Sequence, residues 1–112
     1  MNNRWSKTAA NQLRGIVRTI SRELSKEDAQ RWRAKIRDAV IPLRTYPELG
    51  SVVPLECYAY PPANHERIRQ VICSPYRIIY ETVAGTNRIL AVLHSRQMIA
   101  PSDTCWTASL PD

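Results

Sequence analysis

The sequence predicts an α+β fold, in which an N-terminal antiparallel two-helix hairpin packs on a small, mainly antiparallel, twisted sheet of three to four strands. Apolar residues recur at helical spacing in the first part of the chain, and β-branched and aromatic residues dominate the second part. The length of 112 residues fits one domain. We therefore divide this domain into a helical hairpin over 7–45, a sheet over 51–96 and a tail over 97–112.

Composition excludes several classes of protein. Apolar residues make up 44% and charged residues 23% of the chain, which is typical of globular domains rather than disordered ones. No apolar run approaches the ~18 residues of a membrane span, and the N-terminus lacks the apolar stretch of a signal peptide, so we expect a cytoplasmic protein without membrane contact. Three cysteines without CxxC spacing and the absence of glycine-rich phosphate loops predict neither a metal nor a cofactor.

The net charge of +6 is concentrated in the predicted hairpin. All three lysines and eight of the arginines precede residue 45. A basic surface of this kind points to an anionic partner, which would be nucleic acid or an acidic protein segment, although a solvated helix face has the same composition.

The first helix is predicted over residues 7–24. Ser6 is a suitable N-cap, since its hydroxyl can accept a hydrogen bond from an unpaired backbone N–H. The apolar positions at helical spacing are Ala9, Leu13, Ile16, Val17, Ile20 and Leu24. Arg14, Arg18 and Arg22 recur every fourth residue on another face, where like charges destabilise an isolated helix by about 0.2–0.5 kcal/mol per pair. This row is either a solvated surface or a face for an acidic partner.

The second helix is predicted to begin after Ser25, which can again serve as N-cap. Its apolar stripe consists of Ala29, Trp32, Ile36, Ala39, Val40 and Leu43. Pro42 should distort its last turn, because proline lacks the N–H that a helix requires. Since almost no linker separates the two helices, they should lie antiparallel.

Strands are predicted over 67–73, 76–83 and 88–95, with a short extended piece near 52–58. Ser74-Pro75 and residues 84–87 supply the turns between them. Alternation along the central strand places Arg77 on the same face as Ile79 and Glu81. An arginine among such strongly sheet-forming residues is costly unless it faces a groove or a partner, so Arg77 is a candidate site residue.

Several motifs occur together in a characteristic order. They are Trp5-Ser6, the Leu43, Pro47 and Gly50 spacing, Ile68-Arg69, Tyr76-Arg77-Ile78-Ile79-Tyr80 and Ile89-Leu90-Ala91-Val92-Leu93-His94-Ser95-Arg96. In this order the chain resembles the RelE/ParE superfamily of toxins from bacterial type II toxin–antitoxin systems. The resemblance covers nearly the whole chain and implies a further, very short edge strand within residues 1–6.

The resemblance also implies a growth-arresting toxin that a cognate antitoxin neutralises in a hetero-oligomer, with operator DNA bound only through the antitoxin. Antitoxins of this superfamily wrap an extended or helical segment around the toxin. We expect Arg14, Arg18, Arg22 and Arg77 to receive that segment, because an acidic amphipathic chain complements a basic surface.

The superfamily contains two kinds of target. RelE-like members cleave mRNA on the ribosome, and ParE-like members bind and inhibit DNA gyrase. In the nucleases, the positions that match Arg77 and Arg96 hold the phosphate. His94 would then supply an acid or base, because imidazole titrates near neutrality, and Glu56 is an alternative base. These four residues are catalytic candidates only if the chain is a metal-independent endoribonuclease.

Two absences favour the gyrase target. RelE-like catalysis uses lysines before the central strand, whereas no lysine follows Lys35 in this chain. The tail, which we expect to be partly disordered, has Trp106 as a possible anchor but no tyrosine. We therefore predict a ParE-like gyrase inhibitor, with ribosome-dependent mRNA cleavage as the alternative. A third interpretation is a module that only binds its antitoxin and has lost its toxicity.

Overall fold

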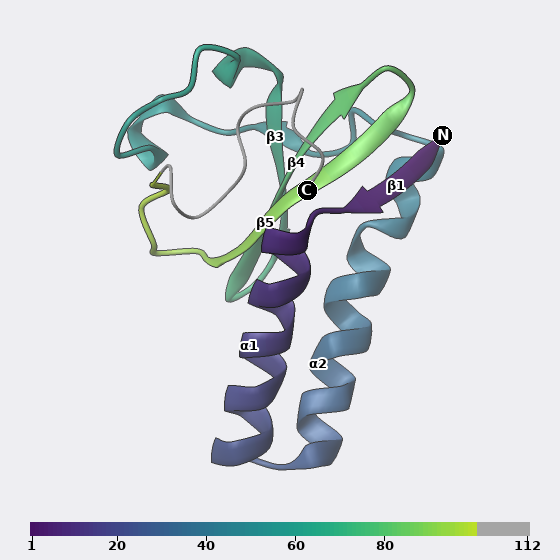
Figure 1. Cartoon of the computed structure of the whole chain (residues 1–112), viewed down its shortest axis with the longest axis vertical. Helices are drawn as coiled ribbons and strands as arrows, with labels where there is room; N and C mark the ends of the chain where they lie inside the picture. Colours follow the sequence, from purple (N-terminus) through teal and green to yellow (C-terminus); the bar gives the residue numbers. More distant parts are fainter. Residues whose placement is uncertain (101–112) are drawn as a thin grey trace.

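The computed structural model describes residues 1–100, which form a five-stranded sheet and a pair of helices (Figure 1). The strands are β1 (Asn2–Trp5), β2 (Ser51–Val52), β3 (Ile68–Cys73), β4 (Tyr76–Val83) and β5 (Thr86–His94). Their order in the sheet is β1-β5-β4-β3-β2. Neighbouring strands are antiparallel, except that β1 runs parallel to β5. The α+β prediction is confirmed.

The sheet has five strands rather than the predicted three to four, because a very short strand completes each edge. β1 has four residues and β2 has two. Strands this short carry little periodic signal of their own, and both are held by hydrogen bonding to a longer neighbour. The extended piece predicted near 52–58 is interrupted by a 3-10 helix over Leu55–Cys57, and that part of the prediction is wrong. Pro54 and Tyr58 on either side of this helix have extended backbone.

The helical hairpin consists of α1 (Lys7–Glu23) and α2 (Lys26–Ala39), which lie side by side and project beyond the sheet (Figure 1). Both predicted caps are present. The Ser6 hydroxyl accepts from Ala9 N at 3.0 Å, and the Ser25 hydroxyl accepts from Asp28 N at 3.0 Å. A 3-10 helix over Ile41–Arg44 follows α2, so the predicted distortion at Pro42 is confirmed.

Side chains from the two faces of the sheet enter two separate cores. The core beneath the helices contains Leu13, Ile36, Leu43, Ile78 and Tyr80, among others. The core on the far face contains Val53, Ile68, Ile79, Leu93 and Ile99, among others. The predicted alternation along β4 is therefore confirmed. The central strands β4 and β5 are buried on both faces, and each large apolar side chain that they bury contributes roughly 1.5–3 kcal/mol.

A bulge in β5 adjusts this alternation. Ile79 pairs with Ala91 and Tyr80 pairs with Ile89, so Leu90 is the additional residue. Leu90 and Ala91 consequently both belong to the far core. The bulge restores the pattern in which Val92 faces the helices and Leu93 faces away from them.

The turn between β4 and β5 is shorter than the predicted 84–87. Ala84 and Gly85 alone form it, with φ angles of +51° and +78°, whereas Thr86 and Asn87 already pair with β4. Positive φ at both central residues is the geometry whose twist matches that of a hairpin.

A hydrogen-bonded clamp holds the segment before β2. The Tyr80 hydroxyl donates to Pro47 O at 2.7 Å and accepts from Gly50 N at 2.9 Å. Gly50 has no room for a side chain, since a Cβ there would lie 2.6 Å from Gln70 O. Burial raises the pKa of the Tyr80 phenol, which keeps the hydroxyl proton available for Pro47.

The first residues of the predicted tail pack against the far core. Ile99 is fully buried, its N–H donates to Cys57 O at 2.9 Å, and its carbonyl accepts from Ala59 N at 2.9 Å. The expectations for Trp106 and the rest of the tail lie outside the described residues. Over residues 1–100, neither helix combines the length and the apolar character that crossing a bilayer requires.

Candidate functional site

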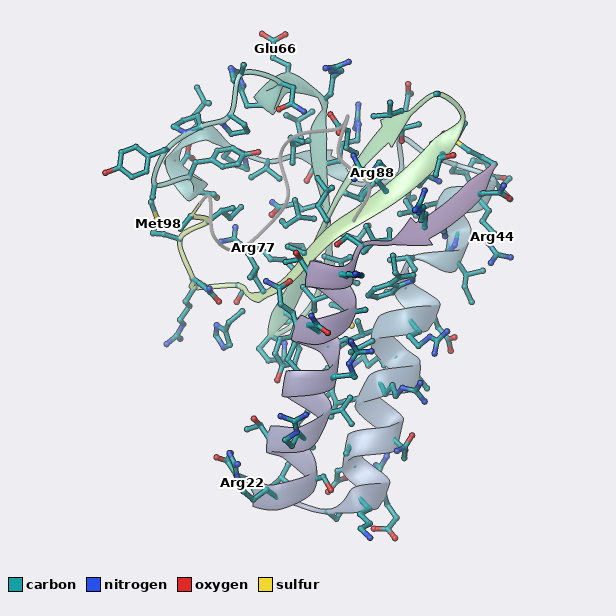
Figure 2. The ribbon with its side chains drawn as sticks, in the orientation of Figure 1. Arg22, Arg44, Glu66, Arg77, Arg88 and Met98 are labelled. Atoms are coloured by element: carbon teal, nitrogen blue, oxygen red, sulfur yellow. The ribbon has the colours of Figure 1, made fainter. Side chains whose placement is uncertain are left out.

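A groove of about 670 Å³ opens between α1 and α2. Its apolar floor is formed by Trp5, at the end of β1, and by Ala10, Leu13 and Val17. Arginines from both helices line its walls, namely Arg14, Arg18 and Arg22 from α1 and Arg33 and Arg37 from α2. The groove follows the projecting hairpin, with Arg22 near the end of α1 farthest from the sheet (Figure 2). An apolar floor between basic walls suits an amphipathic, acidic ligand.

The charges of the groove are not neutralised internally. All five arginines are exposed, and no aspartate or glutamate lines the groove. Arg31 and Asp28 form an ion pair at 3.0 Å, and neither of them lines the groove. Arg14 donates a hydrogen bond to the neutral side chain of Asn11. The five guanidinium groups therefore have no carboxylate partner within residues 1–100 and can bind an external anion.

The structure brings the predicted row of Arg14, Arg18 and Arg22 together along one wall of this groove. Arg33 and Arg37 on the opposite wall were not predicted from the sequence. Their four-residue spacing in the second predicted helix was the available signal, but only the antiparallel packing of the helices shows that they face the first row.

Arg77 lies away from this groove, on the face of the sheet opposite the helices. Its side chain, which is labelled in Figure 2, is only 4% exposed and donates a hydrogen bond to the backbone carbonyl of Gln97. Burial raises the pKa of the neighbouring Tyr58 to about 12, and the positive charge of Arg77 opposes that rise. Arg77 and the arginine row thus lie on different sides of the sheet.

His94 points to the opposite face from Arg77. It pairs with Tyr76 across the strands, and the two rings meet edge to face with centroids 6.1 Å apart. Arg77 pairs with Leu93, whose side chain enters the far core. Because neighbouring residues of a strand alternate, His94 and Arg77 lie on opposite faces.

The two remaining nuclease candidates are exposed. Arg96 follows β5, and its backbone N–H donates to the His94 Nδ1 atom at 3.2 Å. Glu56 lies in the 3-10 helix after β2, outside the groove and the sheet. His94 and Arg96 therefore lie close together, but the structure does not place them on the same surface as Arg77. Residues 1–100 contain no group of three or more His, Cys, Asp or Glu side chains that would hold a metal ion.

Comparison with known proteins identifies the family. The sequence matches the family described as "ParE toxin of type II toxin-antitoxin system, parDE" over residues 4–99. The chain belongs to the ParE toxin family. This result confirms the resemblance inferred from the order of the motifs.

A solved structure has the same fold. It is described as the chromosomal ParDE toxin–antitoxin system from P. aeruginosa, and it superimposes with a TM-score of 0.67 at 20% sequence identity. The match covers 84% of this chain and 95% of that one, so the shared fold accounts for most of both. A search of the curated proteins found no match.

Proposed function

We propose that this member of the ParE family arrests growth by binding and inhibiting DNA gyrase, and that a cognate antitoxin neutralises it. The observation that carries the choice of target is the separation of Arg77 from His94 by the sheet. Cleavage of RNA by its own 2′-hydroxyl needs a proton acceptor, a proton donor and cations around one phosphate. A buried Arg77 that is bonded to a backbone carbonyl cannot meet a phosphate that His94 contacts on the opposite face.

The antitoxin segment is assigned to the groove between α1 and α2. Ala10, Leu13 and Val17 follow one another at helical spacing along its floor. From Ala10 to Arg22 the groove runs for about 18 Å of helix axis, which accommodates about 12 residues of a partner helix. Apolar residues on one side of that helix would cover the floor, and carboxylates at its edges would meet the arginine walls.

The deciding experiment compares two targets. Purified toxin should block the supercoiling of relaxed plasmid by DNA gyrase, and added antitoxin should restore it. In parallel, induced expression should trigger a DNA-damage response without cleavage of mRNA at ribosomal A-site codons. Unimpaired supercoiling at micromolar toxin, combined with mRNA cleavage that the His94→Gln variant loses, would reverse the choice in favour of the nuclease.

A further inference from the structure

We propose that, in the absence of antitoxin, the groove between α1 and α2 binds single-stranded nucleic acid. The phosphates would lie on the arginine walls and the bases would contact the apolar floor. This activity is independent of the proposed inhibition of gyrase, and it uses only features of the hairpin.

The first support is the distribution of charge along the chain. Residues 1–45 contain 11 basic and four acidic side chains, whereas residues 46–100 contain five basic and four acidic ones. The positive field is therefore concentrated on the projecting hairpin, and the concave shape between its helices focuses that field. A polyanion would be steered to this end of the molecule.

The second support is the type and spacing of the cations. All five charged side chains that line the groove are arginines, whose planar guanidinium donates two parallel hydrogen bonds to a phosphate. Arg14, Arg18 and Arg22 follow each other at about 6 Å along the helix axis, and Arg33 and Arg37 repeat this interval on α2. A row at this interval can contact consecutive phosphates of an extended strand. No carboxylate of residues 1–100 forms an ion pair with any of these five arginines.

The third support is the floor, which distinguishes a single strand from a duplex. Leu13 and Val17 provide an apolar surface between the walls, and the partly buried Trp5 offers an indole edge or face at one end. Unpaired bases can cover such a surface or stack on such a ring, whereas a duplex keeps its base faces stacked inside. A duplex would meet only the arginine rims.

The test measures binding of labelled oligothymidylate and oligouridylate to the full chain by fluorescence anisotropy over a range of salt concentrations. The groove variant combines Arg14→Gln, Arg18→Gln and Arg22→Gln. The matched control combines Lys7→Gln, Lys26→Gln and Lys35→Gln, which removes the same charge from exposed positions of the hairpin outside the groove. Circular dichroism establishes that both variants are folded.

We expect the groove variant to bind about tenfold more weakly or worse, while the control changes much less. The slope of log affinity against log salt should fall by about 2 in the groove variant, because each phosphate contact on a single strand contributes about 0.7. A Val17→Thr variant, which keeps all five arginines and the net charge, should also weaken binding, because it makes the floor more polar. The oligothymidylate and oligouridylate arms compare DNA with RNA of nearly the same base, which differs by the C5 methyl group.

Two results would overturn the proposal. Equal losses in the groove variant and the lysine control would mean that only net charge matters. Equal or tighter binding of a duplex of the same length would mean that the floor takes no part. Neither result bears on gyrase, since the supercoiling assay measures inhibition of the enzyme separately.

Discussion

The groove between the helices and the far face of the sheet both contain arginine, but the two regions use it differently. Arg14, Arg18 and Arg22 are exposed, have no carboxylate partner among the described residues and share an open concavity with two further arginines. Arg77 is 4% exposed and donates to the backbone carbonyl of Gln97. A buried guanidinium that is hydrogen-bonded to the protein's own backbone contributes to the stability of the fold, whereas a solvent-exposed guanidinium is available to bind a ligand. Substitutions in the groove should therefore change binding, and those around the sheet should change stability.

The largest effect is expected in the groove. Replacing Arg14, Arg18 and Arg22 together by alanine should weaken the complex with the antitoxin by about 3 kcal/mol, because each lost charged contact costs on the order of 1 kcal/mol. Titration calorimetry at several salt concentrations measures this loss, and the salt dependence should decrease with it. The urea midpoint of the free toxin should stay nearly unchanged. An unaltered affinity at all salt concentrations would contradict the assignment of the antitoxin to the groove.

Arg77→Ala should show the opposite behaviour. Truncation removes a buried side chain and leaves the Gln97 carbonyl without its donor, so the free energy of unfolding should fall by about 2–3 kcal/mol. Urea denaturation measures the loss. The affinity of the folded variant for antitoxin should remain within about twofold of the wild type, since Arg77 lies outside the groove. A large loss of affinity without loss of stability would indicate that Arg77 contacts the antitoxin directly.

Gly50→Ala tests the clamp at the β2 edge. The added Cβ would lie 2.6 Å from Gln70 O and 2.7 Å from Tyr80 Cε1, so the backbone or the ring must move. We expect a loss of about 1–3 kcal/mol in the free energy of unfolding. Gly15→Ala is the matched control, because nothing lies within 4 Å of the Cβ it would add. That helical change should be neutral or stabilising by up to about 1 kcal/mol, and a similar loss in both variants would contradict the clamp.

Ser6→Ala should cost about 1 kcal/mol in the free energy of unfolding. The Ser6 hydroxyl accepts from Ala9 N and donates to Leu90 O at 3.3 Å, so it both caps α1 and links it to β5. Ser25→Ala removes the other cap, whose hydroxyl bonds only within its own first turn. A smaller loss for Ser25→Ala in thermal or urea unfolding would isolate the contribution of the link to β5.

The last effect is confined to alkaline pH and concerns the far face of the sheet. Burial raises the folded-state pKa of Tyr58 from 10.0 to about 12, so the folded state favours the protonated phenol. Its contribution to stability is fully present below pH 10 and is lost as the pH rises towards 12. Tyr58→Phe should flatten this part of the curve of unfolding free energy against pH. An unchanged curve would show that Tyr58 does not titrate differently in the folded and unfolded states.

Local sequence determined the helices, their caps and the three long strands. Apolar spacing around Leu13 and Ile36 and the hydroxyls of Ser6 and Ser25 act within one or two turns, so they can be recognised without the rest of the chain. The row of Arg14, Arg18 and Arg22 could be predicted for the same reason, because residues four apart share a helix face. The order of the motifs was sufficient to indicate the family.

Tertiary structure alone decided which arginines line the groove. Arg33 and Arg37 face the row because α2 packs antiparallel to α1, whereas Arg77 lies away from it and donates to Gln97, 20 residues later. The strands β1 and β2 likewise depend on partners distant in the chain. Spacing within a segment records which side chains share a face, but burial and pairing depend on contacts between segments, which no local pattern encodes.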